Sequence, residues 1–159
     1  MRVLVIRHAQ AVPQGTRDLR DADRPLTADG ERRFRATALA LARIVPEPDV
    51  LLTSPLLRAR QTATLLAAAW TDIEPTLEPA LASGSVDAIL RALEQHARGA
   101  TVVLVGHEPT VSALLGELLG VISSEAIVFE PGAAALLEIS SVARHSGRLV
   151  WFLPPDLSQ

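Results

Sequence analysis

Near the N-terminus the sequence reads Val3-Leu4-Val5-Ile6-Arg7-His8-Ala9, an apolar run that ends on an arginine and a histidine. The run is too short for a helix and is bounded by polar residues, a pattern that predicts a buried strand over residues 2–6. This strand carries Arg7 and His8 to its carboxyl end. Strands commonly meet solvent with polar residues, so the pair indicates a function only if other parts of the chain converge on it.

Composition limits the possible functions. A chain of 159 residues suits one domain, predicted to span residues 1–159. The net charge of −3 argues against a nucleic-acid-binding protein, which normally carries a basic surface. The absence of cysteine excludes thiolate nucleophiles, disulfides and cysteine-based zinc sites. No apolar run approaches the ~20 residues of a membrane-spanning helix, and the first run is interrupted too early for a signal peptide, so we expect a cytoplasmic protein without a membrane partner.

Strands and helices alternate along most of the chain. Buried strands are predicted at residues 2–6, 49–53 and 101–105, with an edge strand within residues 71–84. Helices are predicted from Thr27 to before Pro46, from Ser54-Pro55 to about Trp70, from Ser85 to Gly99 and from Pro109 to Gly120. Strands follow at residues 126–129, 133–139 and 148–153, the last two as a hairpin. This order predicts a three-layer α/β domain, a mostly parallel sheet flanked by helices with a C-terminal antiparallel hairpin.

The unusual polar residues follow the three buried strands. Arg7 and His8 follow the first strand, Ser54 and Arg58 follow the second, and His107 follows the third. Parallel strands joined by right-handed crossovers end at one edge of the sheet, so these side chains should meet there. A cation in the first turns of a helix opposes the helix dipole, which indicates either solvent exposure or a bound anion beside Arg58. Two helix N-termini opened by proline also favour an anion at this edge, and a phosphoryl group fits all of these features.

The chemistry assigns distinct roles to two histidines and two arginines. A neutral imidazole can attack phosphorus, arginines can neutralise the phosphoryl oxygens, and the second histidine is most useful when protonated. Spacing alone leaves open which histidine attacks. A metal site is the rival interpretation, disfavoured by the adjacent cations. No glycine-rich nucleotide loop follows a predicted strand, while His96 and His145 are expected at a helix end and in a turn without a role in the site.

Four segments resemble motifs of the histidine phosphatase superfamily. They are Leu4-Val5-Ile6-Arg7-His8-Ala9, Arg24-Pro25-Leu26-Thr27-x-x-Gly30, Thr53-Ser54-Pro55-Leu56-Leu57-Arg58-Ala59-Arg60-Gln61-Thr62 and Val105-Gly106-His107-Glu108-Pro109. The resemblance runs from residue 2 to about residue 153 and implies a phosphoglycerate mutase-like fold. Within this superfamily the short chain and the Arg-Pro-Leu-Thr segment are most similar to the small bacterial-type phosphohistidine phosphatases.

The resemblance implies that His8 is the nucleophile and that a covalent phosphohistidine forms on it and is hydrolysed by water, with no metal or other cofactor. The catalytic set is then His8, Arg7, Arg58 and His107. The residues expected to bind substrate are Arg7, Arg58, His107, Ser54 and Gln10.

The sequence departs from the superfamily at two places. Ala9 and Gln10 follow the histidine where glycine and often an acidic residue are usual, and alanine cannot adopt backbone angles open only to glycine. Many members also carry a general acid before the third helix. Residues 71–84 offer Asp72, Glu74 and Glu78 for this role, and Glu78 is the candidate.

The weak match for a general acid bears on the substrate. An alkoxide leaving group needs a proton from the enzyme, whereas the imidazole of phosphohistidine can carry its own near neutral pH. Residues 71–84 are also too few to form a lid, so we expect an open site, bordered by the long loop after His8. An open site suits a phosphohistidine carried by a protein. We therefore expect a phosphatase acting on a phosphohistidine-bearing protein domain. The alternatives are a phosphomonoesterase for small phosphorylated molecules and a non-catalytic phosphate-binding module.

Overall fold

The computed structural model describes residues 1–96, 100–121 and 127–155. Its strands are β1 Arg2–Arg7, β2 Val50–Thr53, β3 Pro75–Leu77, β4 Thr101–Gly106, β5 Ala134–Ile139 and β6 Gly147–Leu153. Its helices are α1 Ala28–Ile44, α2 Leu57–Trp70, α3 Val86–Glu94 and α4 Thr110–Leu119, with short 3-10 turns η1 Asp21–Asp23 and η2 Pro79–Ala82. The predicted α/β class is confirmed.

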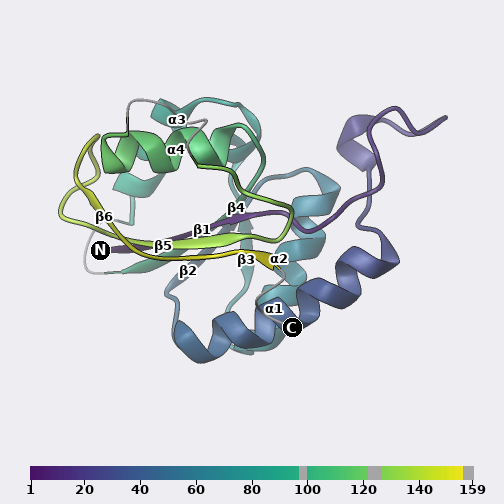
Figure 1. The fold of residues 1–159 in the computed structure, drawn as a ribbon, viewed down its shortest axis with the longest axis horizontal. Coiled ribbons are helices and arrows are strands. Elements are labelled where there is room, and N and C mark those ends of the chain that lie inside the picture. The colour runs from purple at the N-terminus through teal and green to yellow at the C-terminus, as the bar shows by residue number, and fades with distance from the viewer. Residues whose placement is uncertain (97–99, 122–126, 156–159) are drawn as a thin grey trace.

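The strands form one mixed sheet in the order β3-β2-β4-β1-β5-β6. The strands β3, β2, β4 and β1 run parallel, whereas β5 is antiparallel to β1 and β6 is antiparallel to β5. Both the predicted edge strand and the predicted C-terminal hairpin are therefore present. In Figure 1 the sheet is seen nearly edge-on, with α3 and α4 above it and α1 and α2 below.

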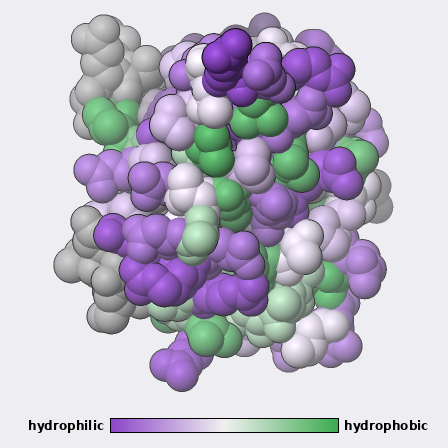
Figure 2. Space-filling model, turned by 90° about the vertical axis from the view of Figure 1, so that its right-hand side faces the viewer, coloured by the Kyte–Doolittle hydropathy of each residue, from purple (hydrophilic) through white to green (hydrophobic). Residues whose placement is uncertain are grey.

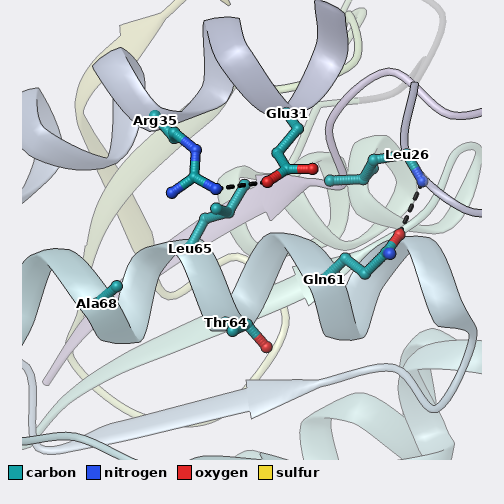
Figure 3. A pocket seen from close by; sticks show the side chains of 7 residues that line it. All are labelled: Leu26, Glu31, Arg35, Gln61, Thr64, Leu65 and Ala68. Atoms are coloured by element: carbon teal, nitrogen blue, oxygen red, sulfur yellow. Dashed lines mark hydrogen bonds and ion pairs between the residues drawn. The ribbon is translucent and has the colours of Figure 1, made fainter. Parts of the chain in front are cut away.

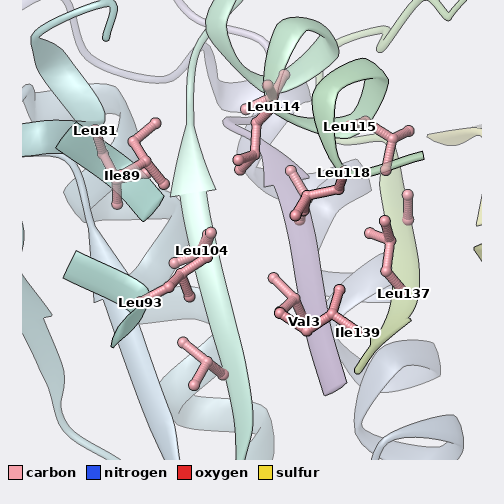
Figure 4. Close-up of a cluster of buried hydrophobic side chains, with 14 of the residues drawn as sticks. Val3, Leu81, Ile89, Leu93, Leu104, Leu114, Leu115, Leu118, Leu137 and Ile139 are labelled. Carbon is pink, nitrogen blue, oxygen red and sulfur yellow. The ribbon is translucent and has the colours of Figure 1, made fainter. Parts of the chain in front are cut away.

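Each face of the sheet has its own apolar core. Successive side chains of β1 point to opposite faces, so Val3 and Val5 pack toward α3 and α4 while Leu4 and Ile6 pack toward α1 and α2. Figure 4 shows the first of these clusters, in which leucines of α4 lie over β1, β4 and β5. Burial on both faces explains why β1 reads as an unbroken apolar run.

The predicted helix signals hold for α1 and α3. The Oγ1 of Thr27 accepts a hydrogen bond from the Gly30 N–H at the start of α1. The Oγ of Ser85 does the same for the Ala88 N–H at the start of α3. The helix α4 ends at Leu119 and is capped by Gly120, whose φ of 72° places it in the left-handed region that suits glycine.

Two helix starts differ from the sequence prediction. The helix α2 begins at Leu57 rather than Pro55, because the Ser54 hydroxyl accepts from the Leu56 N–H and also bonds a histidine of the site. The helix α4 begins at Thr110, with Pro109 in the flanking position.

The strand predicted over residues 126–129 is wrong for residues 127–129, which are irregular. Both backbone groups of Phe129 bond side chains instead of a neighbouring strand. Residue 126 and the predicted helix end at Gly99 lie outside the described residues. Within the described parts of the chain, no helix has the length and apolarity to cross a membrane.

Candidate active site

The polar strand ends meet at one edge of the sheet. In the parallel pair of β1 and β4, Arg7 lies opposite Gly106, so His8 and His107 follow the two strands side by side. Their ring centroids are 5.0 Å apart. This edge is on the right of Figure 1, and Figure 2 turns that side toward the viewer, where hydrophilic side chains predominate around smaller apolar areas.

His8 is buried and its ring is held at both nitrogens. Its Nδ1 lies 2.7 Å from the Ala9 carbonyl oxygen, which can only accept, so Nδ1 carries the proton. Its Nε2 accepts a hydrogen bond of 3.2 Å from Nε–H of Arg58. Burial lowers the pKa of His8 from its ordinary 6.5 to about 3, and the neighbouring cations act in the same direction. The ring is therefore neutral at pH 7, with its lone pair on Nε2.

Thr62 connects the histidine segment to α2. Its Oγ1 accepts from the Ala9 N–H at 3.0 Å and donates to the Arg58 carbonyl at 2.7 Å. The side chain is fully buried. Sequence reasoning gave Thr62 no role, although its position one helical turn after Arg58 is the signal that could have suggested one.

Arg58 is buried and makes three hydrogen bonds with described residues. Besides Nε2 of His8, its guanidinium bonds the Asp21 carbonyl at 2.8 Å and the Asp21 carboxylate at 3.2 Å. The long loop after His8 therefore borders the site through η1. Burial lowers the pKa of Arg58 while the Asp21 carboxylate raises it. Arg58 is therefore not solvent-exposed, and its described acidic partner is the side chain of Asp21.

Arg7 contacts the segment before β5, whereas Arg58 contacts the loop after His8. Its guanidinium donates to the Phe129 carbonyl at 2.6 Å, and the Phe129 N–H donates to the Glu108 carboxylate at 3.0 Å. Glu108 also accepts from Ser112 at 2.6 Å. Glu108 thus holds the backbone that anchors Arg7, a connection that no sequence pattern indicated. The Nε of Arg7 is buried and has no hydrogen-bond partner among the described residues.

His107 is paired through one nitrogen only. Its Nε2 lies 2.7 Å from the Ser54 hydroxyl, whereas its buried Nδ1 has no partner in the described part of the chain. Burial lowers the pKa of His107 to about 4, with Arg58 as the next cause. The ring is neutral at pH 7 in this arrangement, unlike the protonated state expected from sequence. Ser54, expected to bind substrate, here contacts His107.

Gln10 is exposed at the start of the loop, and the contacts found for it come from its backbone. Its carbonyl accepts from the Thr27 N–H at 3.0 Å and lies so close to α1 that a Cβ on Gly30 would be 2.2 Å from the Gln10 oxygen. Ala9 is not among the described non-glycine residues with positive φ, so the missing glycine creates no backbone conflict there.

Glu78 lies beyond the end of β3 and is half-buried. Its carboxylate accepts from the Ala80 N–H at 2.9 Å and caps η2, while its own N–H donates to the Thr53 carbonyl. These contacts give Glu78 a structural role at the edge of the site. In the ranges that the structure describes, no group of three or more histidines and carboxylates is arranged to hold a metal ion.

A separate pocket lies between α1 and α2. Figure 3 shows that it is bordered by Glu31 and Arg35 from α1 and by Gln61 from α2, whose side chain accepts from the Leu26 N–H at 2.7 Å. None of the two histidines and two arginines of the site lines it. The bond from Gln61 holds the end of the long loop against α2.

Comparison with known proteins identifies the family. The family model described as histidine phosphatase superfamily (branch 1) matches residues 3–85. The chain belongs to the histidine phosphatase superfamily. The first three of the four motifs found in the sequence fall within this match, and the family confirms the predicted resemblance.

Individual relatives of this superfamily agree. The phosphohistidine phosphatase SixA of Escherichia coli is 33% identical over 123 residues, 74% of each chain. An uncharacterized protein of Picosynechococcus sp. is 48% identical over 92 residues, so the match spans 56% of that relative's length. Among solved structures, the protein histidine phosphatase SixA complexed with tungstate is 26% identical, covers 100% of both chains and has a TM-score of 0.87. The phosphoglycerate mutase-like fold is thereby confirmed, and the expected enzyme class, a phosphatase, agrees with the family.

Proposed function

We propose that this chain removes the phosphoryl group from phosphohistidine on a protein, through a covalent intermediate on His8 and without a metal ion. The observation that carries the proposal is the state of the His8 ring. It is a neutral imidazole whose Nδ1–H is bound to the Ala9 carbonyl and whose Nε2 lone pair lies beside the Arg58 guanidinium. A nucleophilic histidine needs this state, because only the neutral ring has a lone pair to offer phosphorus.

The first step transfers the phosphoryl group to His8. A phosphoryl oxygen takes over the Nε–H of Arg58, which frees Nε2 of His8 to attack phosphorus. The substrate ring carries a proton on its other nitrogen. The new P–N bond forms while the P–N bond to the substrate ring breaks, the departing nitrogen keeps the electron pair, and the ring leaves as neutral imidazole. The phosphorylated His8 ring is cationic, and the Ala9 carbonyl stabilises it by accepting from Nδ1–H.

Arg7 and His107 supply the remaining contacts to the phosphoryl group. Each has a buried polar nitrogen without a hydrogen-bond partner among the described residues. Leaving such an atom unpaired costs about 1–3 kcal/mol, a cost that a phosphoryl oxygen would remove. A dianion beside His107 also raises the pKa of that ring above its value of about 4, so that His107 becomes the donor expected from its chemistry.

The second step returns the enzyme to its starting state. A water molecule attacks phosphorus, the P–N bond to His8 breaks, and Nε2 recovers its lone pair. The proton lost by the water goes to solvent and inorganic phosphate leaves. Arg7 and Arg58 donate to the phosphoryl oxygens in both steps, which stabilises the charge that shifts in each transition state.

The leaving group favours phosphohistidine over a sugar phosphate. Protonating an alkoxide is worth about 10² to 10⁴ in rate, and Glu78, the carboxylate suggested for this task, is bound to the Ala80 N–H. A phosphohistidine ring can carry a proton on its second nitrogen near neutral pH, so it leaves as neutral imidazole without an acid from the enzyme. The relative from Escherichia coli is named a phosphohistidine phosphatase, and the tungstate in the SixA structure is an oxyanion, both of which support the proposal.

A turnover assay with two substrates tests the proposal. The protein is incubated with a phosphohistidine peptide and with an aryl phosphate, and released phosphate is measured for the wild type and for H8N. The matched control is H96N, which changes a histidine in the turn just after α3. We expect rapid release from the peptide that is lost in H8N and retained in H96N. Release only from the aryl phosphate favours a phosphomonoesterase, and phosphate binding without release from either favours a binding module.

A further inference from the structure

The Asp21 carboxylate is shared between two arginines. One oxygen accepts from Arg58 at 3.2 Å, and the other accepts from Nε of Arg24 at 2.9 Å. The Asp21 carbonyl accepts a further hydrogen bond of 2.8 Å from Arg58. A single residue of the loop therefore meets two nitrogens of the guanidinium that also contacts His8.

The loop that carries Asp21 is itself anchored. Arg24 donates to the Val12 carbonyl at 2.7 Å, and the Val12 N–H donates to the Pro25 carbonyl at 2.9 Å. The side chains of both arginines that bind Asp21 are largely buried, with 13% of Arg24 and 6% of Arg58 exposed. The two bonds of Val12 join the two ends of the loop to each other. The bonds from Asp21 to Arg58 hold η1 beside the first turn of α2.

We propose that Asp21 is a positioning residue, which orients the Arg58 guanidinium so that its Nε–H points at Nε2 of His8. The proposal rests on the phosphatase function described above. An arginine side chain has several rotatable bonds, and fixing its plane before the reaction lowers the cost of reaching the transition state. The Asp21 side chain is 45% exposed, so a substrate that binds beside Arg58 can also approach this carboxylate.

The charge of Asp21 has an opposite effect on anion binding. A carboxylate beside Arg58 offsets part of the positive charge available to a phosphate. Removing the carboxylate therefore leaves the arginine more mobile and the site more positive. The expected signature is a lower kcat together with phosphate binding that is unchanged or tighter, which simple loss of structure would not produce.

Three variants and two readouts test the proposal. The variants are D21A, D21N and the matched control D23A, which removes the other carboxylate of the same 3-10 turn and its contact with Arg20. For D21A we expect kcat on the phosphohistidine peptide to fall about tenfold or more, with a Kd for inorganic phosphate no weaker than that of the wild type. D21N retains an oxygen that can accept from Arg58, so it should recover part of kcat. D23A should behave as the wild type.

The second readout needs no turnover. The Nε–H resonance of Arg58, assigned with R58K, should be protected from solvent exchange in the wild type and in D23A and lose that protection in D21A. Normal kcat or unchanged protection in D21A would overturn the proposal. So would a joint loss of thermal stability, kcat and phosphate binding. If the wild type does not hydrolyse the peptide, the proposed function fails, and the exchange measurement still decides the role of Asp21.

Discussion

A hydrogen bond of 3.2 Å joins Nε–H of Arg58 to Nε2 of His8. Because a guanidinium can only donate, this contact leaves the His8 proton on Nδ1, where the Ala9 carbonyl accepts it. The arginine therefore holds the ring in the reactive tautomer and is already beside the nitrogen on which a phosphoryl group would form. Several consequences of this arrangement can be measured.

The two buried histidines should make the fold less stable in acid. Their pKa values are lowered to about 3 for His8 and about 4 for His107, below the ordinary 6.5, chiefly by burial. Between these pKa values and 6.5 the unfolded chain binds more protons than the folded chain. The histidines therefore do not lower the free energy of unfolding above about pH 6.5, and that free energy falls as the pH drops toward 4. Each histidine contributes a loss of at most about 1.4 kcal/mol per pH unit, reached between its folded and unfolded pKa values.

Denaturant unfolding of the wild type, H8Q and H107Q between pH 7 and pH 5 checks this expectation. Carboxylates titrate in all three proteins, so the difference between the slopes isolates the histidines. Each variant should show a shallower fall in the free energy of unfolding than the wild type. Equal slopes in all three would mean that the histidines titrate normally in the folded protein.

Thr62→Val should reduce both stability and activity. Valine has a similar shape but leaves the buried Ala9 N–H without its partner and removes the hydroxyl bond to the Arg58 carbonyl. We expect a loss of about 1–3 kcal/mol in the free energy of unfolding and a lower kcat/KM. The control is T64V on the same helix, whose exposed hydroxyl bonds the Arg60 carbonyl. If T62V and T64V behave alike, Thr62 does not position the nucleophile.

Ser54→Ala should lower activity more than its effect on stability explains. The hydroxyl contacts Nε2 of His107 and the Leu56 N–H, so its loss frees the His107 ring to turn. We expect kcat/KM to fall about tenfold, because small displacements of a binding group are costly to a reaction. The helix cap Ser85 offers a matched control, since S85A should cost about 1 kcal/mol of stability and leave kcat/KM unchanged. A normal kcat/KM in S54A would contradict a role for the hydroxyl in holding His107.

Gly30→Ala should destabilise the protein although alanine favours helices. In an unobstructed helix this substitution gains about 1 kcal/mol. Here the new Cβ would lie 2.2 Å from the Gln10 carbonyl oxygen, so the loop and α1 must separate. We expect a net loss of about 1–3 kcal/mol in thermal or denaturant unfolding. A gain in stability would mean that the loop does not pack against α1 as described.

The meeting of His8, Arg58 and His107 follows from a general rule, and for that reason the sequence predicts it. Apolar runs identified the strands, and parallel strands connected by helices end together. In the predicted helix before Pro46, apolar Phe34 and Leu41 stand seven residues apart, a spacing that places them on one face, and both are buried. These predictions rest on periodic patterns that depend little on the detailed path of the chain.

The contacts around the site do not follow from such patterns. Asp21 lies in a loop without periodicity, so nothing in the sequence indicates that it reaches Arg58. Ser54 carries the signal of a helix cap, but its hydroxyl also bonds a histidine that is distant in sequence, and the helix starts later. The segment ending at Phe129 is apolar enough for a strand, yet side chains of Arg7 and Glu108 take its backbone groups. Tertiary contacts decide each of these cases.

The most direct test is to trap the covalent intermediate. The protein is mixed with a labelled phosphohistidine peptide, quenched in base within a single turnover, digested and mapped by mass spectrometry. We expect an acid-labile phosphate on the peptide that contains His8, present in H96N and absent in H8N. Label on His107, or normal turnover by H8N, would contradict it.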